Sequence, residues 1–171
     1  MERVECTLEM MLAARDARRR RQQSHFDTNP GQTLLVATVV APGKYKLTHR
    51  TSIIAEAERE ALYSRFAGHI CNSLSLDLPS GHETWLSLDI DPQEAKRIAV
   101  DIEDTHTLGR LFDIDIITSS LAPLSRTETG SAPRRCLLCG EDARVCMRAH
   151  THTPDEVDAR ISRLVDAYMK T

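Results

Sequence analysis

The 171-residue sequence is poor in aromatic residues, in long apolar runs and in net charge, and each shortage excludes a class of protein. Aromatic residues make up 4% of the chain, which leaves no obvious platform for stacking bases. No stretch approaches the length of a membrane-spanning helix, and the N-terminal residues lack the order of charge, apolar core and cleavage site of a signal peptide. A formal net charge of −3 argues against a general nucleic-acid binder. We therefore expect neither a membrane protein nor a partner of nucleic acid.

Cysteine is present in an odd number, five, and three of the five lie between residues 136 and 146. This distribution indicates free thiols or a metal site in a reducing cytoplasm, and not a disulfide framework. The spacing Cys136-x2-Cys139-x6-Cys146-x5-His152 fits a closed tetrahedral zinc site, with His150 as an alternative fourth ligand. The competing interpretation is that small buried thiols simply pack the C-terminal segment.

A chain of this length can bury one core, so we expect a single α+β domain with a mixed or antiparallel sheet flanked by helices. The loosest stretch, residues 125–135, separates two predicted regions. Residues 1–125 are expected to form the catalytic domain. Residues 126–171 are expected to form a Cys-rich C-terminal segment and a terminal helix that pack on the same domain.

Periodicity predicts helices over 3–24 and 51–75 and strands over 33–43 and 83–91. A last helix is predicted to begin after Thr153, with Pro154 in the first turn and Glu156 completing a capping box.

The first predicted helix carries an apolar stripe, Leu8, Met11 and Leu12, that becomes basic at Arg15 and Arg18. These two arginines continue the side predicted to be buried, and we expect them to contact an anionic ligand where the helix leaves the core. The alternative is a solvated helix end.

Lys46 follows the predicted end of the first strand at Pro42-Gly43, a common place for ligand-binding loops. An ordinary surface loop would look the same.

Residues 98–103 and 112–116 both alternate between apolar and other residues, which predicts a hairpin with one apolar face. The opposite face would then collect Asp101, Glu103, Asp113 and Asp115. Four carboxylates on one face repel one another unless a cation lies among them, and Mg²⁺ is the divalent ion that pairs such acids with phosphates. The spacing predicts a magnesium site at Asp113 and Asp115, with Glu103 or Asp101 as a third acid. The alternative is a solvated face of an edge hairpin.

Three residues just before this pair add to the same hypothesis. Gly109 permits close backbone approach, and the Arg110 fork suits phosphate. His106, in the predicted hairpin break, is a candidate to orient or deprotonate an attacking hydroxyl, unless it is an ordinary surface histidine.

Five segments occur in a familiar order and spacing: "ARDARRRRQ", "TVVAPGKYK", "HTLGRLFDIDII", "LSR" and "RRCLLCGEDARVCMRAHTH". In them the sequence resembles the citrate lyase holo-acyl-carrier-protein synthase family, also called apo-citrate lyase phosphoribosyl-dephospho-CoA transferase. The resemblance covers roughly residues 12–153.

The resemblance implies a nucleotidyltransferase-like fold and a nucleotidyltransferase-type enzyme. The donor would be 2′-(5″-triphosphoribosyl)-3′-dephospho-CoA, and the acceptor a serine of the citrate lyase acyl carrier protein, the γ subunit, with release of pyrophosphate. The central motif maps onto His106, Gly109, Arg110, Asp113 and Asp115. Secondary motifs map onto Arg15, Asp16, Arg18, Lys46, Arg126, Cys136, Cys139, Cys146 and His152.

The sequence thus supports a cytoplasmic, Mg²⁺-dependent transferase with a possible structural zinc. Two alternatives remain: a nucleotidyltransferase that acts on another acceptor, and a non-catalytic binding module stabilised by zinc.

Overall fold

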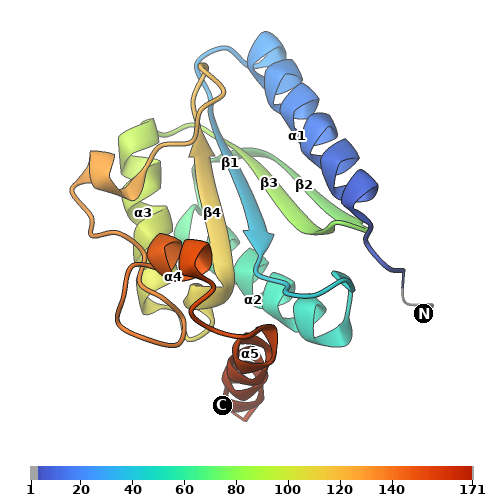
Figure 1. Cartoon of the computed structure of the whole chain (residues 1–171). Coiled ribbons are helices and arrows are strands. Elements are labelled where there is room, and N and C mark those ends of the chain that lie inside the picture. The colour runs from blue at the N-terminus through green and yellow to red at the C-terminus, as the bar shows by residue number, and fades with distance from the viewer. Residues whose placement is uncertain (1–3, 171) are drawn as a thin grey trace.

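The computed structural model describes residues 4–170, in which five α-helices surround a four-stranded antiparallel sheet (Figure 1). The ends of the two predicted regions, residues 1–3 and 171, lie outside the described residues. The elements are α1 (Leu8–Thr28), β1 (Thr33–Val39), α2 (His49–Arg65), β2 (Ile70–Leu78), β3 (Gly81–Leu88), α3 (Pro92–Thr105), the short η1 (Gly109–Leu111), β4 (Phe112–Ile117), the short η2 (Arg126–Thr129), α4 (Ala143–Ala149) and α5 (Pro154–Tyr168). None of the described helices is both long and apolar enough to traverse a lipid bilayer.

The strands lie in the order β2-β3-β1-β4, and every neighbouring pair is antiparallel. One face of the sheet is covered by α2 and α3, while α1 runs across the other face (Figure 1). The predicted α+β class with an antiparallel sheet and a Cys-rich C-terminal segment is confirmed.

The larger core lies between the sheet and the face of α2 and α3. Alternate residues of β4 point into it, so that Phe112, Ile114 and Ile116 are buried. The terminal helix α5 adds Ile161 and Val165 to the same core, because its apolar residues recur on one face. The C-terminal helix is thereby attached to the domain that the sheet builds.

The smaller core lies on the opposite face, where Leu34, Val36, Trp85 and Ile117 meet Phe26 of α1. Ala14, Ala17, Arg18 and Arg21 of α1 are half-buried as well.

The apolar stripe predicted to anchor α1 was wrong. Leu8, Met11 and Leu12 are 75%, 46% and 52% exposed. The inward face of α1 instead carries half-buried Arg18 and Arg21, because the sheet surface below offers the carboxylate of Glu83.

The predicted hairpin was also wrong in its first half, because residues 92–105 form helix α3. The Asp91 side chain accepts hydrogen bonds from two backbone amides of the first turn, and Pro92 suits the first helical position. The buried residues Ala95, Ala99 and Ile102 follow helical spacing, at i, i+4 and i+7. Consequently Asp101 does not join the acids of β4.

The second predicted helix was too long. It ends at Arg65, and Gly68 adopts a φ of +87°, a conformation that glycine tolerates better than other residues. Ile70, expected on the helix, begins β2 instead. The start of α5 agrees with the prediction, because Thr153 and Glu156 form a reciprocal capping box.

Candidate active site and metal cluster

The two aspartates of β4 point to the face of the sheet that α1 covers. In the strand register Asp113 lies opposite Thr38, and Asp115 lies opposite Val36. Thr38 is also paired with Glu83 on its other side, so a row across three strands runs Asp113–Thr38–Glu83. Because side chains alternate along a strand, both aspartates and this glutamate share one face.

The two aspartates differ in burial. Asp113 is largely exposed, with 57% of its side chain accessible, whereas Asp115 is half-buried. Burial raises the pKa of Asp115, and the neighbouring charge of Asp113 raises it further, while Lys96 and Arg18 oppose the rise. The pair is thus an arrangement of like charges that a bound cation would stabilise.

Arg18 reaches this face from α1 and is fixed by Glu83. Its Nε and Nη2 atoms donate to Oε1 of Glu83 at 3.1 and 2.8 Å. The second oxygen of Glu83 accepts a hydrogen bond from Trp85 Nε1 at 2.9 Å, so each oxygen of this buried carboxylate has a partner. Arg21 lies 3.8 Å from the same carboxylate and also stands over the Trp85 ring. Glu83 therefore positions a guanidinium beside the aspartates.

Glu83 was not among the site residues predicted from the sequence, although one signal was available. It occupies the same face of an alternating strand as the single tryptophan, whose indole N–H needs an acceptor when buried.

Arg134 stands on the other side of the aspartates. Its Nη1 atom lies 3.5 Å from Asp113 Oδ1, its Nη2 atom lies 3.0 Å from Glu103 Oε1, and it also donates to the Phe112 carbonyl. Arg134 was not among the predicted site residues. Its position two residues before Cys136 gave no hint that the C-terminal segment returns to β4.

Glu103, predicted as a third metal ligand, has other partners. Its Oε1 atom accepts the amide of Ile114 at 3.0 Å, and Lys96 Nζ donates to the Ile114 carbonyl at 3.0 Å. These two side chains of α3 satisfy backbone groups on the edge of β4 that no strand pairs. Burial raises the pKa of Glu103, against the opposing effect of Arg134. The oxygen predicted to bind metal is thus already engaged by the Ile114 amide and by Arg134.

His106 is not brought to the aspartates. Its ring packs against Phe112 and Tyr168, on the opposite face of the sheet, and its Nδ1 atom accepts the amide of Leu108 at 3.0 Å. Burial lowers the pKa of His106. The histidine caps the end of α3 and supports the core.

Three further predicted residues have other partners or face solvent. Lys46 donates to the Ala41 carbonyl within its own loop. Arg126 lies 2.5 Å from Asp104, which ties η2 to α3. Arg15 is exposed on α1.

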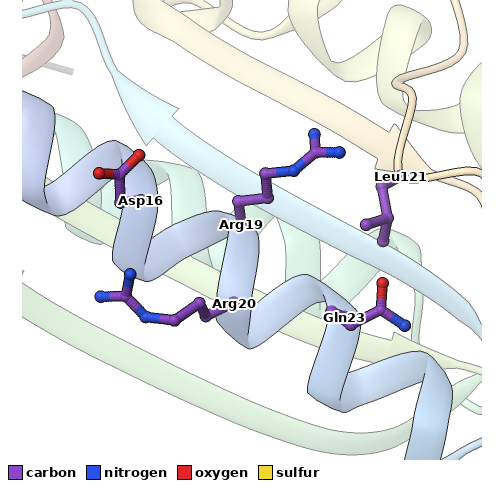
Figure 2. A pocket seen from close by; sticks show the side chains of 5 residues that line it. All are labelled: Asp16, Arg19, Arg20, Gln23 and Leu121. Carbon is purple, nitrogen blue, oxygen red and sulfur yellow. The ribbon is translucent and has the colours of Figure 1, made fainter.

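A small pocket lies between α1 and the segment that follows β4. Its volume is about 320 Å³, and Asp16, Arg19, Arg20 and Gln23 of α1 line it together with Leu121 (Figure 2). Figure 2 shows the Arg19 side chain extending toward the Leu121 segment, while Arg20 extends away from it.

The cysteine cluster is formed by Cys136, Cys139, Cys146 and His152. Their donor atoms all lie within 4.8 Å of one another, so the four side chains could hold one metal ion. Cys146 comes from α4, and His152 directly precedes the cap of α5. His150, the alternative ligand, lies outside the cluster because it ends α4 in the left-handed conformation.

The thiols of the cluster do not ionise alike. Burial opposes ionisation of Cys136, but amide hydrogens of Leu138 and Cys139 point at its sulfur and lower its pKa to about 7. Burial and hydrogen bonds from the neighbouring thiols raise the pKa of Cys146 to about 11. A metal ion is what would allow all three sulfurs to carry charge together.

Comparison with known proteins gives consistent matches. Residues 6–168 match the protein family described as apo-citrate lyase phosphoribosyl-dephospho-CoA transferase. An Escherichia coli protein of that name is 35% identical over 159 residues, which are 91% of this chain and 86% of that protein. A Shigella flexneri protein of the same name gives the same values. The Haemophilus influenzae protein CitXG is 34% identical over 161 residues, which are 92% of this chain but 34% of that longer protein.

Proposed function

Because this chain belongs to the apo-citrate lyase phosphoribosyl-dephospho-CoA transferase family, we propose that it attaches the prosthetic group of citrate lyase to the apo acyl carrier protein, the γ subunit. The carboxylates and guanidiniums gathered around β4 support this proposal, since transfer from a triphosphate depends on positioning and charge neutralisation.

The proposed reaction is of the nucleotidyltransferase type. The serine oxygen of the carrier attacks the α-phosphorus of the triphosphoribosyl-dephospho-CoA donor, and a new P–O bond forms. The bond between the α-phosphorus and the bridging oxygen breaks, pyrophosphate leaves with the electron pair, and the serine proton passes to solvent or to a base.

Asp113 and Asp115 are the residues proposed to hold Mg²⁺. Two observations fit this ion: the carboxylates share one face, and Asp113 is open to solvent. Mg²⁺ is usually held by one or two carboxylates, with phosphate oxygens and water completing the octahedron, so a third protein acid is not required. When bound, it would neutralise charge on the triphosphate.

Arg18 and Arg134 are proposed to contact phosphate oxygens on either side of the metal. Glu83 holds Arg18 in place, which lowers the entropic cost of ordering a long side chain when the donor binds. The substrate-binding roles expected for Arg15, Lys46 and Arg126 stay predictions, because Arg15 is exposed on α1, Lys46 bonds within its own loop, and Arg126 pairs with Asp104.

Zinc is the proposed occupant of the cysteine cluster, since three thiolates and one imidazole suit its tetrahedral geometry. The ion would be structural. It would hold residues 126–171 as a Cys-rich appendage of the catalytic domain formed by residues 1–125.

We also propose a cytoplasmic location. All five cysteines of the chain lie within the described residues and are free thiols, which fits a reducing compartment.

The test is the variant Asp113→Asn, with the apo carrier protein, the triphosphoribosyl donor and Mg²⁺. Mass spectrometry of the carrier should show the added prosthetic group with the wild-type protein and a loss of at least a hundredfold in rate with the variant. The matched control is Asp166→Asn, which changes an exposed carboxylate on α5. Because Asp113 is exposed, the circular dichroism spectrum and melting temperature should not change. Transfer at the wild-type rate by Asp113→Asn would disprove the metal assignment, and no transfer by the wild type would disprove the function.

A further inference from the structure

The C-terminal segment encloses a second and larger pocket. Its volume is about 620 Å³, within the range of small-molecule sites. One wall is the chain that leaves β1, including Val40 and Pro42, and the other is built from the cysteine cluster and its surroundings, including Leu137, Leu138 and Val157. The pocket therefore offers apolar surface to a ligand.

The described lining of this pocket combines arginines with thiols of the cysteine cluster. Three arginines line it, Arg110, Arg134 and Arg135, and no aspartate or glutamate of the described chain does. The Arg110 guanidinium has no described carboxylate oxygen within 4.0 Å and instead donates to the carbonyl of Arg135. Burial lowers the pKa of Arg110, and the nearby charge of Arg134 lowers it further. An anion in the pocket would relieve this concentration of positive charge.

Arg134 connects this pocket with the acidic pair. The same guanidinium that lines the pocket lies 3.5 Å from Asp113. A ligand that contacts Arg134 in the pocket would therefore lie close to Asp113. The pocket and the two aspartates together suit a molecule with an anionic centre, an apolar part and a triphosphate end.

We propose that this pocket binds the dephospho-CoA part of the donor. The arginines would contact its 5′-diphosphate, since guanidinium forks bind phosphate oxygens in pairs. The apolar walls would take the adenine or the pantetheine arm, and the attached triphosphoribosyl group would then reach Asp113 and Asp115. The identity of the ligand rests on the proposed function, but its binding requires no chemical step.

Three of the four cluster residues, Cys136, Cys146 and His152, also line this pocket. A metal ion that holds them together would therefore fix one wall of the binding site. Removal of the metal should weaken ligand binding even where no transfer is measured.

The experiment is calorimetric titration of the full chain with dephospho-CoA, which lacks the triphosphoribosyl group and cannot react. Wild type should bind, and Arg110→Gln and Arg135→Gln should each weaken binding at least tenfold. The matched control is Arg148→Gln, an exposed arginine on α4 that does not line the pocket, and it should bind as wild type does. Adenosine and pantetheine without phosphate should bind at least tenfold more weakly than dephospho-CoA.

Two results would overturn the inference: no binding of dephospho-CoA by a wild-type protein that performs transfer, or unchanged binding by both arginine variants. The outcome for the proposed function is separate. Asp113→Asn should lose transfer and keep dephospho-CoA binding. If dephospho-CoA binds as expected but wild type modifies no carrier, the pocket assignment stands and the proposed function fails.

Discussion

Gly109 is fixed by lack of space. A β-carbon at this position would lie 2.5 Å from the carbonyl oxygen of Ile102 and 2.6 Å from that of Glu103. The close approach that the sequence suggested is therefore to the last turn of α3, and it sets where η1 and Arg110 begin. At the scale of single residues, the shared face of Asp113 and Asp115 was readable from their spacing. The roles of Glu83 and Arg134 were not, because each depends on a partner more than 20 residues away.

Replacing Gly109 by alanine should therefore destabilise the fold. The new methyl group must displace backbone, and overpacking of this kind costs about 1–3 kcal/mol in the free energy of unfolding. Urea unfolding followed by circular dichroism measures the loss. Gly140→Ala is the control, since nothing lies within 4 Å of a β-carbon there. Equal stability of the two variants would contradict the steric explanation.

Glu58 is expected to make the stability of the protein depend on pH. It is buried on α2, one of its oxygens has no hydrogen-bond partner, and burial together with the charge of Asp113 raises its pKa to about 8. The folded state holds the proton more tightly than the unfolded state. The free energy of unfolding contributed by this group is therefore lost progressively as pH rises from about 4.5 to about 8.

The variant Glu58→Gln should match the stability of wild type at about pH 4, where Glu58 is protonated in both the folded and the unfolded state, and exceed wild type at about pH 9, where the charge of Glu58 is buried. Urea unfolding at both pH values gives the comparison, with exposed Glu56→Gln on the same helix as control. A stability difference that does not change with pH would show that Glu58 does not titrate in this range.

At the scale of elements, α3 and β4 form one unit. Lys96 and Glu103 of the helix bond to the carbonyl and the amide of Ile114, so side chains stand where a further strand would otherwise pair. Sequence periodicity located β1, β3, β4 and α5 but misread α3 as a strand. The alternation at 98, 100 and 102 mimicked a strand because α3 is buried on more than one side, so that Val100 and Ile102 are both buried. Only the Asp91-Pro92 start signal distinguishes the helix.

The variant Lys96→Met should weaken the attachment of α3 to β4. The buried carbonyl of Ile114 would lose its donor, which costs about 1–3 kcal/mol. Hydrogen exchange of the β4 amides should rise in this variant. Arg97→Met, an exposed change on the same helix, should leave exchange unchanged. The same protection in both variants would refute the contribution of the lysine.

At the scale of the whole molecule, the candidate site joins three distant parts of the chain: α1 supplies Arg18, β4 supplies the aspartates, and the C-terminal segment supplies Arg134. Sequence reasoning identified the ligands of the cysteine cluster from their spacing alone. It could not place the cluster beside β4, because that placement depends on the packing of α5 and on the ion pair between Arg134 and Glu103.

Removal of metal should therefore loosen the C-terminal segment and lower the melting temperature. Dialysis against a chelator followed by differential scanning calorimetry tests this, and added zinc should restore the transition. Cys139→Ser should melt below wild type and respond little to zinc, whereas the exposed Cys71→Ser should behave as wild type does. A melting temperature insensitive to chelator and zinc in the wild type would rule out a structural metal.

The edge of the sheet at β4, where side chains of α3 bond to the backbone, also limits how copies of this chain can associate. A strand arriving from another molecule finds both backbone groups of Ile114 already bonded, so β4 offers no continuous template for intermolecular pairing. The other edge strand, β2, is largely exposed to solvent and pairs only with β3 among the described strands. Any polymer built by strand addition would have to start there.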